Sequence, residues 1–273
     1  MQTDKTPKVS IITVNYNNLD GMKKTYQSIV EQTYNDWEWI VIDGGSGQND
    51  TDFIRQHEEQ ISYWCSEPDK GPYNGMNKGI VKACGQYFVF MNSGDTFYDA
   101  EVLHHVFSQP RQGDVLYGDW AEITVKDETT IKEAPKVFSL HALYYDNICH
   151  QAMFVKGNIL KDSPYDESYT LFADWAKWLE LTLAKHTFEY VPYVICRYQL
   201  GGISNTRMDL VQKEVKRLRT EEVPAAIRET ISCIDDKVNI HPLAYEANRL
   251  IKKKKLYKKI IHMAIRIIHL IEK

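Results

Sequence analysis

Three short apolar stretches, each followed directly by a polar turn, constrain the fold of this chain more than any other feature. They span residues 9–15, 37–43 and 87–91 and are rich in β-branched and aromatic residues. Such runs are typical of strands buried on both faces of a parallel sheet. Apolar residues recur at helical spacing over 22–32 and 74–83. This alternation predicts an α/β fold with a mainly parallel central sheet flanked by helices.

The rest of the chain adds less regular elements to this prediction. The sequence predicts further strands and helices at 51–60 (helix), 61–66 (strand), 114–119 (strand into a turn), 148–155 (strand), 173–185 (helix), 190–198 (strand) and 208–219 (helix). The segments 121–125 and 130–134 are predicted to form a β-ribbon.

Composition excludes several classes of protein. The chain has 273 residues, 43% hydrophobic and 26% charged, which fits one large globular domain, or one domain with an appendage. Its net charge of −4 argues against a basic nucleic-acid-binding protein. The five cysteines are odd in number, widely spaced and without a Cys-x-x-Cys pair, so neither a disulfide framework nor a zinc site is expected.

The sequence also indicates a cellular location. The first seven residues are polar, and no run of 18 apolar residues occurs. We therefore expect neither a secretion signal nor a membrane-spanning helix. Together with the pattern of free cysteines, this predicts a cytoplasmic protein.

Polar side chains follow each predicted strand of the first half. Asn15 and Tyr16, Asp43, Asp69 with Lys70, and Asp95 all come after a strand or its short loop. Ligands of open parallel sheets bind where the strands end at their carboxyl edge. Any single aspartate here is explained as well by a helix N-cap or a turn. Four polar strand ends at one edge favour a binding site.

Eight motifs in order resemble the family 2 glycosyltransferases of the GT-A fold, in the branch that builds bacterial surface polysaccharides. The resemblance covers residues 8–205 and rests on Val-Ser-Ile-Ile-Thr-Val-Asn-Tyr-Asn at 9–17, Asp43-Gly-Gly-Ser46, Glu67-Pro-Asp-Lys-Gly71 with Met76-Asn-Lys-Gly-Ile80, Met91-Asn-Ser-Gly-Asp95, Tyr117-Gly-Asp119, Cys149-His-Gln151, Ala173-Asp-Trp175 and Gly201-Gly-Ile-Ser204. It implies a GT-A domain over 1–205 and a helical extension over 206–273.

The resemblance implies a divalent metal, Mn²⁺ or Mg²⁺, held by Asp95. A departing nucleoside diphosphate builds up negative charge that a cation stabilises, and such cations take oxygen ligands. Family members often read Asp-x-Asp here, whereas this chain has Asn92-Ser-Gly-Asp95. The alternative is a type I turn in which Asp95 serves as a cap.

The resemblance also assigns the nucleotide. Asp43 is expected to accept a hydrogen bond from the ring N–H of uracil, which makes a UDP-sugar the expected donor. Asn15 and Tyr16 would border the base and ribose, and Asp69 the ribose and diphosphate. Lys70 would meet phosphate, although a solvated loop lysine explains it equally well.

Asp174 is the predicted catalytic base. An alcohol that attacks the anomeric carbon needs a base within hydrogen-bond reach. The family places a carboxylate at the start of a helix for this purpose, often as Glu-Asp, and this chain reads Ala173-Asp174. The alternative is an aspartate in the first helical turn, favoured by the helix dipole.

The resemblance implies five residues on the donor-sugar or acceptor side, of which His150, Trp175 and Asn77 also have a structural alternative. His150 and Asn92 are polar groups beside the expected cleft. Trp175 would stack on a sugar ring or pack in the core. Asn77 would line the donor pocket or satisfy a buried helix, and Arg197 is the cation nearest to a predicted lid at 201–204.

The last 22 residues differ from the rest. Residues 252–273 carry eight Lys or Arg and one Glu, so this segment is +7 and the remainder −11. Apolar residues at 260, 264, 267, 268 and 271 fall on one helical stripe. This pattern favours a helix lying on the anionic inner face of a membrane over one that docks on protein.

The sequence thus predicts an inverting, metal-dependent transferase with a nucleotide-sugar donor and a lipid-linked or growing glycan acceptor, without nucleic acid. Two alternatives stay open. A nucleotidyltransferase usually carries a Gly-rich, basic loop after its first strand, which this chain lacks. A catalytically weak nucleotide-sugar-binding scaffold at the membrane is favoured only by Asn92 and Ala173.

Overall fold

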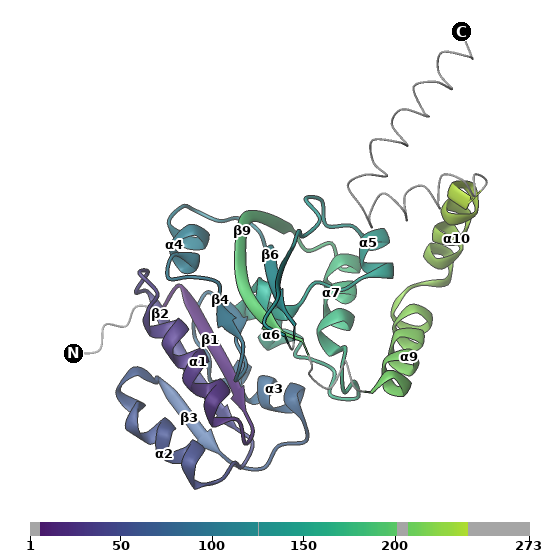
Figure 1. The fold of residues 1–273 in the computed structure, drawn as a ribbon. Helices are drawn as coiled ribbons and strands as arrows, with labels where there is room; N and C mark the ends of the chain where they lie inside the picture. Colours follow the sequence, from purple (N-terminus) through teal and green to yellow (C-terminus); the bar gives the residue numbers. More distant parts are fainter. Residues whose placement is uncertain (1–5, 125, 201–206, 240–273) are drawn as a thin grey trace. The chain divides into compact units, whose positions relative to one another are not determined.

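A computed structural model describes residues 6–124, 126–200 and 207–239 of the chain (Figure 1). It divides into two compact units, Met1–Glu222 and Val223–Lys273. The first unit extends past the predicted boundary at residue 205, so that α9 (Met208–Arg217) belongs to it. The second unit contains α10 (Ala225–Asn239). The predicted lid at 201–204 and the basic tail at 252–273 lie outside the described residues.

The first four strands form the parallel part of the sheet. Its order is β3 (Tyr63–Ser66), β2 (Trp37–Asp43), β1 (Val9–Asn15) and β4 (Tyr87–Phe90), all parallel, which confirms the predicted α/β arrangement. Every residue of β1 is buried, as are all of β2 except Trp37. The continuous apolar runs of the sequence follow from this burial on both faces.

Helices connect these strands and set the geometry of their ends. They are α1 (Leu19–Val30), α2 (Gln48–Gln56), the short 3₁₀ helix η1 (Glu58–Gln60) and α3 (Pro72–Lys82). Helix α3 packs against β1 and β2. A Cβ on Gly79 would lie 2.4 Å from Ile12 Cγ2, and one on Gly75 2.7 Å from Val14 Cγ1. These glycines let α3 approach β1 closely, which brings the loop before α3 to the edge of the sheet.

The second part of the sheet is mixed. Strand β8 (Met153–Lys156) runs antiparallel to β4 and to β6 (Val115–Ile123), and β9 (Phe188–Gln199) is parallel to β6. Two short strands, β5 (Thr96–Phe97) and β7 (Thr129–Lys132), run antiparallel to β9 and β6. In Figure 1, β6 and β9 lie beside each other as long curved strands. The strictly parallel order of the first part therefore does not continue.

Two sequence-based boundaries are wrong in this region. The strand predicted at 114–119 does not end in a turn: it continues as β6 through Gly118 to Ile123 and includes the first arm of the ribbon. The pairing with β9 shifts its register on either side of Asp119, so the polar Gly-Asp pair marks an irregularity inside a strand. The strand predicted at 148–155 begins as a 3₁₀ helix, η2 (His150–Ala152), before β8.

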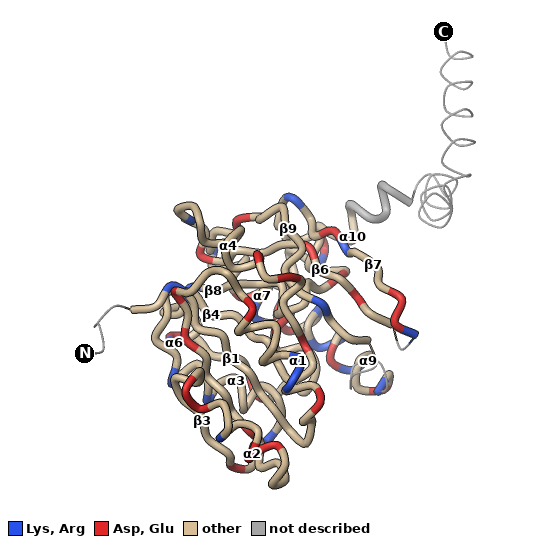
Figure 2. The backbone as a smooth tube through the Cα atoms, turned by 60° about the vertical axis from the view of Figure 1, so that its left-hand side comes forward, with Lys and Arg blue, Asp and Glu red and all other residues tan. Residues whose placement is uncertain are grey.

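Further helices complete the first unit. They are α4 (Val102–Phe107), α5 (Leu140–Tyr145), α6 (Gly157–Asp162), α7 (Ala173–Leu183) and the π-helical turn η3 (Leu218–Glu222). Helix α4 packs on β9, α6 on β8, and α5 and η3 on α7. Acidic and basic residues are interspersed through the described chain (Figure 2). Among the described residues, no helix is both long and apolar enough to cross a bilayer.

Candidate active site

A cleft of about 830 Å³ lies where the four parallel strands end. Its lining comes from the segments that follow β1, β2, β3 and β4, and consists of Val14, Tyr16, Asn18, Gly44, Gly45, Pro68, Asp69, Gly71, Pro72 and Ser93. We call it the strand-end cleft. Its position is the one expected for a ligand of an open parallel sheet.

Asn15 and Asp43 are joined in a buried network beside this cleft. Asn15 Nδ2 donates to Asp43 Oδ1 at 2.8 Å, and the Ser66 hydroxyl and the Ser46 backbone N–H donate to Asp43 Oδ2 at 2.6 and 2.8 Å. Burial raises the pKa of Asp43, but these hydrogen bonds outweigh it and hold the pKa below its usual value. The carboxylate is therefore ionised and fixed by protein donors on both oxygens.

Tyr16 and Asp69 face the strand-end cleft directly. Tyr16 is 65% exposed, and Asp69 Oδ1 accepts a hydrogen bond from the Gly71 N–H at 3.0 Å. A Cβ on Gly44 would lie 2.6 Å from Asp69 Oδ2, so only glycine leaves room for this carboxylate. Lys70, on the same loop, is exposed. The structure thus groups the predicted nucleotide residues around one cleft, and their individual roles stay predictions.

Asp95 has the features required of a single carboxylate ligand to a metal. Gln151 Nε2 donates to its Oδ2 at 2.8 Å, and among the described residues no donor meets its Oδ1. Burial raises the pKa of Asp95 to about 6, and the hydrogen bond from Gln151 opposes the rise. A cation bound at Oδ1 would supply the missing counter-charge. The described chain holds no cluster of three metal-binding side chains, so phosphate and water would complete the shell.

The Asp174 carboxylate is held from several directions. It is 5% exposed, and its Oδ1 accepts from the Trp175 backbone N–H at 2.8 Å and lies 3.1 Å from the Tyr73 hydroxyl. His150 Nδ1 lies 3.1 Å from Asp174 Oδ2, and His150 Nε2 lies 3.2 Å from Asn92 Nδ2. Both contacts are satisfied when His150 donates from Nδ1 and accepts at Nε2, the tautomer this network assigns.

Asp174 opens into a second cleft of about 410 Å³. Its lining is Tyr73, Trp120, Glu122, Lys132, Glu133, Asp146, Asn147, Cys149, His150, Gln151, Leu171, Phe172, Asp174 and Tyr198, and we call it the Asp174 cleft. Burial and the nearby Asp174 charge raise the pKa of Tyr73 well above its usual value, so its phenol stays protonated. Its single proton is shared between the Leu171 carbonyl oxygen at 2.7 Å and Asp174 Oδ1 at 3.1 Å. The Trp175 backbone N–H and His150 are therefore the stronger contacts that orient the carboxylate.

Two adjacent residues of η2 connect the groups predicted for metal binding and for proton removal. His150 contacts Asp174 and Asn92, while Gln151 contacts Asp95. Asn92 in turn accepts the Asp95 backbone N–H at its carbonyl oxygen, at 2.8 Å. Residues far apart in sequence therefore form one continuous network.

Of the five residues expected on the donor-sugar or acceptor side, three have side chains outside this network. Asn77 bonds Tyr165 through both ends of its amide, donating to the carbonyl oxygen at 2.9 Å and accepting the N–H at 3.0 Å, which matches its structural alternative. Trp175 is 5% exposed and donates to the Leu143 carbonyl at 2.6 Å, so its ring packs in the core. Arg197 lies over the Tyr98 ring at 4.6 Å and lines a separate surface hollow.

Neither Tyr73 nor Gln151 was predicted from the sequence to have a role of its own; Gln151 was only part of the Cys149-His-Gln151 motif. Tyr73 follows Pro72 in the first turn of α3 and reaches Asp174 across 101 positions of sequence. No local pattern marks such a contact. The sequence contains one hint for Gln151: an amide side chain that becomes buried on an apolar segment usually needs a polar hydrogen-bond partner.

Comparisons with known proteins agree on one family. Residues 10–152 match the family described as Glycosyl transferase family 2. A glycosyltransferase of Mycobacterium tuberculosis is 32% identical over 208 residues, which cover 74% of this chain and 78% of the relative.

Solved structures share the fold. TarS 1–349 of S. aureus in complex with UDP-GlcNAc aligns with a TM-score of 0.65 at 17% identity, over 82% of this chain and 70% of that one. The mannosyltransferase PcManGT from Pyrobaculum calidifontis, in complex with GDP-Man and Mn²⁺, aligns with a TM-score of 0.58 at 13% identity. The alignment covers 97% of this chain and 81% of that one.

Proposed function

Because the chain belongs to glycosyltransferase family 2 and has the GT-A fold, we propose that it transfers a sugar from a UDP-sugar, with inversion, to a hydroxyl of a lipid-linked or growing glycan. One observation carries the proposal: the network through His150 and Gln151 connects Asp174, in its own cleft, to Asp95 at the sheet edge. Donor and acceptor would meet across this network.

On the donor side, the strand-end cleft would hold the nucleotide. Asn15, Tyr16 and Asp43 would surround the base, and Asp69 with Lys70 would face the ribose and diphosphate. A Mn²⁺ or Mg²⁺ at Asp95 would stabilise the charge on the departing diphosphate. The UDP-GlcNAc and Mn²⁺ in the solved relatives support a nucleotide-sugar and a divalent cation. The transferred group is proposed to be a hexose or an N-acetylhexosamine.

On the acceptor side, Asp174 would act as the general base. An acceptor hydroxyl in the Asp174 cleft gives its proton to the carboxylate while its oxygen attacks the anomeric carbon from the face opposite the diphosphate. The bond to the diphosphate breaks as the new glycosidic bond forms, which inverts the configuration without a covalent intermediate. Trp175 and Tyr73 meet Asp174 Oδ1, so the hydroxyl would bind Oδ2. His150 Nδ1 lies 3.1 Å from Oδ2, and Asn147 Nδ2 lies 3.5 Å from it.

The proposal is tested by nucleotide release from a panel of UDP- and GDP-sugars with Mn²⁺ or Mg²⁺. We expect metal-dependent UDP release that is lost in Asp95→Ala. Transfer to an acceptor should fall by about 10²–10⁴-fold in Asp174→Ala, while that variant still binds UDP. Calorimetric UDP binding without turnover of any donor would keep the transferase and point to a missing acceptor, and absence of UDP binding would refute the nucleotide site.

We further propose that the basic tail, residues 252–273, holds the protein at the inner face of the membrane. The support is the charge of +7 combined with one apolar helical stripe. A chain lacking this tail should leave anionic vesicles in a sedimentation assay while keeping activity on a soluble acceptor. Unchanged vesicle binding by the shortened chain would contradict the proposal.

A further inference from the structure

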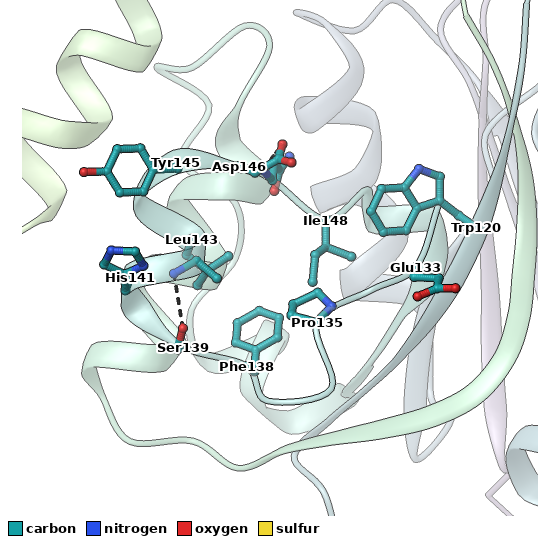
Figure 3. Close-up of a pocket in the computed structure, with 12 residues that line it drawn as sticks. Trp120, Glu133, Pro135, Phe138, Ser139, His141, Leu143, Tyr145, Asp146 and Ile148 are labelled. Carbon is teal, nitrogen blue, oxygen red and sulfur yellow. Dashed lines mark hydrogen bonds between the residues drawn. The ribbon is translucent and has the colours of Figure 1, made fainter. Parts of the chain in front are cut away.

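A pocket of about 380 Å³ opens beside the Asp174 cleft (Figure 3). It is enclosed by α5, the segment before it and Trp120 of β6, and its apolar side chains are Trp120, Pro135, Phe138, Ala142, Leu143 and Ile148. In Figure 3, Pro135, Phe138, Leu143 and Ile148 gather on one side of the opening, with Trp120 across from them and the Asp146 carboxylate at the rim. We call it the apolar pocket.

The walls of the apolar pocket are fixed by contacts behind them. Phe138 stacks on Phe188 with ring centroids 3.8 Å apart. The indole N–H groups of Trp175 and Trp178 donate to the carbonyl oxygens of Leu143 and Ile148, at 2.6 and 3.1 Å. Both tryptophans belong to α7, which also carries Asp174. The pocket is therefore held in a set position relative to the proposed base.

The apolar pocket and the Asp174 cleft adjoin each other. Trp120, Glu133, Asp146 and Asn147 line both of them. Asn147 Nδ2 lies 3.5 Å from Asp174 Oδ2, so the junction is adjacent to the proposed base. A molecule whose hydroxyl reaches Asp174 can place a directly attached group in the apolar pocket.

The charge at this junction restricts what can pass through it. Glu133 and Asp146 lie around it, whereas Glu122, which lines only the Asp174 cleft, is paired with Lys132 at 3.2 Å. A phosphate in the junction would meet like charge from Glu133 and Asp146, although solvent weakens this repulsion because both side chains are exposed. A neutral link avoids this repulsion.

We propose that the apolar pocket binds an aryl or alkyl group that a neutral bond joins to the acceptor sugar, next to the attacked hydroxyl. This rests on the proposed function and names the acceptor class: an uncharged glycoside with an apolar aglycone. An apolar cavity of about 150 Å³ holds one benzene, so about 380 Å³ admits a group of roughly a dozen carbons.

The test compares methyl, phenyl and hexyl β-D-glucopyranosides and phenyl phosphate by calorimetric titration of the full chain with UDP and Mn²⁺. Full burial of a phenyl-sized group corresponds to about a tenfold or larger gain in affinity, so phenyl and hexyl glucosides should bind at least that much more tightly than methyl glucoside. Phenyl phosphate should bind more weakly than phenyl glucoside. Equal binding of methyl and phenyl glucosides, or tighter binding of phenyl phosphate, would overturn the proposal.

Single substitutions test whether the preference for phenyl over methyl glucoside arises in the apolar pocket. Ala142→Phe fills the pocket and should remove the preference for phenyl over methyl glucoside. The matched control, Val137→Phe, adds the same ring at a position that is 77% exposed and outside the pocket lining, and should keep it. Should Ala142→Phe fail to fold, Trp120→Ala removes one wall and should reduce the preference. Identical behaviour of pocket and control variants would refute the assignment.

UDP release from the donor panel, measured on the same samples, reports separately on the proposed function. A phenyl preference without any donor turnover would keep the apolar site and reject the transferase mechanism. Donor turnover without a phenyl preference would keep the transferase and reject the apolar site.

Discussion

The two parts of the sheet supply the site in different ways. In the first part, β1, β2, β3 and β4 run parallel, and the residues that follow them lie at one edge because the strands end there. In the second part, β8 is antiparallel to both of its neighbours, and the groups around Asp174 come from a 3₁₀ turn, from α3 and from the start of α7. The strand-end cleft follows from topology, whereas the Asp174 cleft is assembled by packing.

This difference suggests that the two parts of the sheet bind different ligands. A nucleotide is a large, uniform ligand, which the regular ends of a parallel sheet can accommodate. An acceptor varies in shape, and irregular segments such as 133–148 can vary without disturbing the sheet. Substitutions in the two regions should therefore separate nucleotide binding from transfer.

Among the variants that test this comparison, the largest loss of kcat is expected at His150, where the two parts of the sheet meet. His150→Ala removes a donor to Asp174 and the partner of Asn92. We expect kcat to fall by about 10- to 100-fold, as is usual when an orienting partner is lost, with little change in UDP affinity. Steady-state kinetics and UDP titration measure both quantities.

His150→Asn is the informative companion to this variant. Its amide N–H can replace the Nδ1–H toward Asp174, so it should retain more activity than His150→Ala. If both variants were as active as the wild-type enzyme, His150 would have no positioning role.

A smaller effect is expected at Glu214 of α9, which holds the segment leading into α7. Its carboxylate is buried and accepts the backbone N–H groups of Thr170, Leu171 and Phe172 at 2.8, 2.9 and 3.1 Å. Glu214→Gln points an amide N–H at one of these donors. We expect a loss of about 1–3 kcal/mol in the free energy of unfolding and a lower kcat.

Urea denaturation and kinetics with UDP titration check this expectation, with Glu128→Gln at an exposed position as control. UDP affinity should stay unchanged, because Glu214 contacts only the second part. A drop in UDP affinity equal to the drop in kcat would show that the two parts do not respond separately.

The smallest expected effect is on the free energy of unfolding at acidic pH. It should change in the same direction for a carboxylate in either part of the sheet. Hydrogen bonds from Thr187 and the Lys156 ammonium, opposed by burial, lower the pKa of Asp114, just as serine donors lower the pKa of Asp43. Each carboxylate then contributes stability at pH values above the usual 3.8, and this is lost as the pH falls below that value.

Asp114→Asn and Asp43→Asn should each cost about 1 kcal/mol at pH 7 and less near pH 3, where the carboxylate of the unfolded wild-type chain binds a proton and the unfolded state is stabilised. Denaturation series at both pH values provide the measurement. A cost that grows on acidification would contradict the direction of the pKa shifts.

Prediction from sequence was accurate where a residue's neighbours in the chain determine its environment. Strands β1 and β2 lie at the predicted residues, and α7 begins at Ala173 as expected. Prediction failed at β6, because a continuous strand through Gly118 and Asp119 depends on its pairing with β9. The pattern around Gly118 is that of a turn, and only the neighbouring strand overrides it.

The same distinction holds for the candidate site. Asp43, Asp69, Asp95 and Asp174 were identified from position and resemblance, and each lies in or beside one of the two clefts or their shared network. Arg197 was chosen for its closeness in sequence to a predicted lid. On β9, successive side chains point to opposite faces, so Tyr198 lines the Asp174 cleft while Arg197 lines a different hollow.

The sequence by itself determined the parallel strands, the polar residues at their ends and the family, because strand patterns and short motifs are local properties of the chain. Tertiary structure alone decided that His150 and Tyr73 meet Asp174 and that an apolar pocket adjoins them. Those contacts join residues 24 and 101 positions apart. Contacts of that kind arise from how elements pack, which no local pattern encodes.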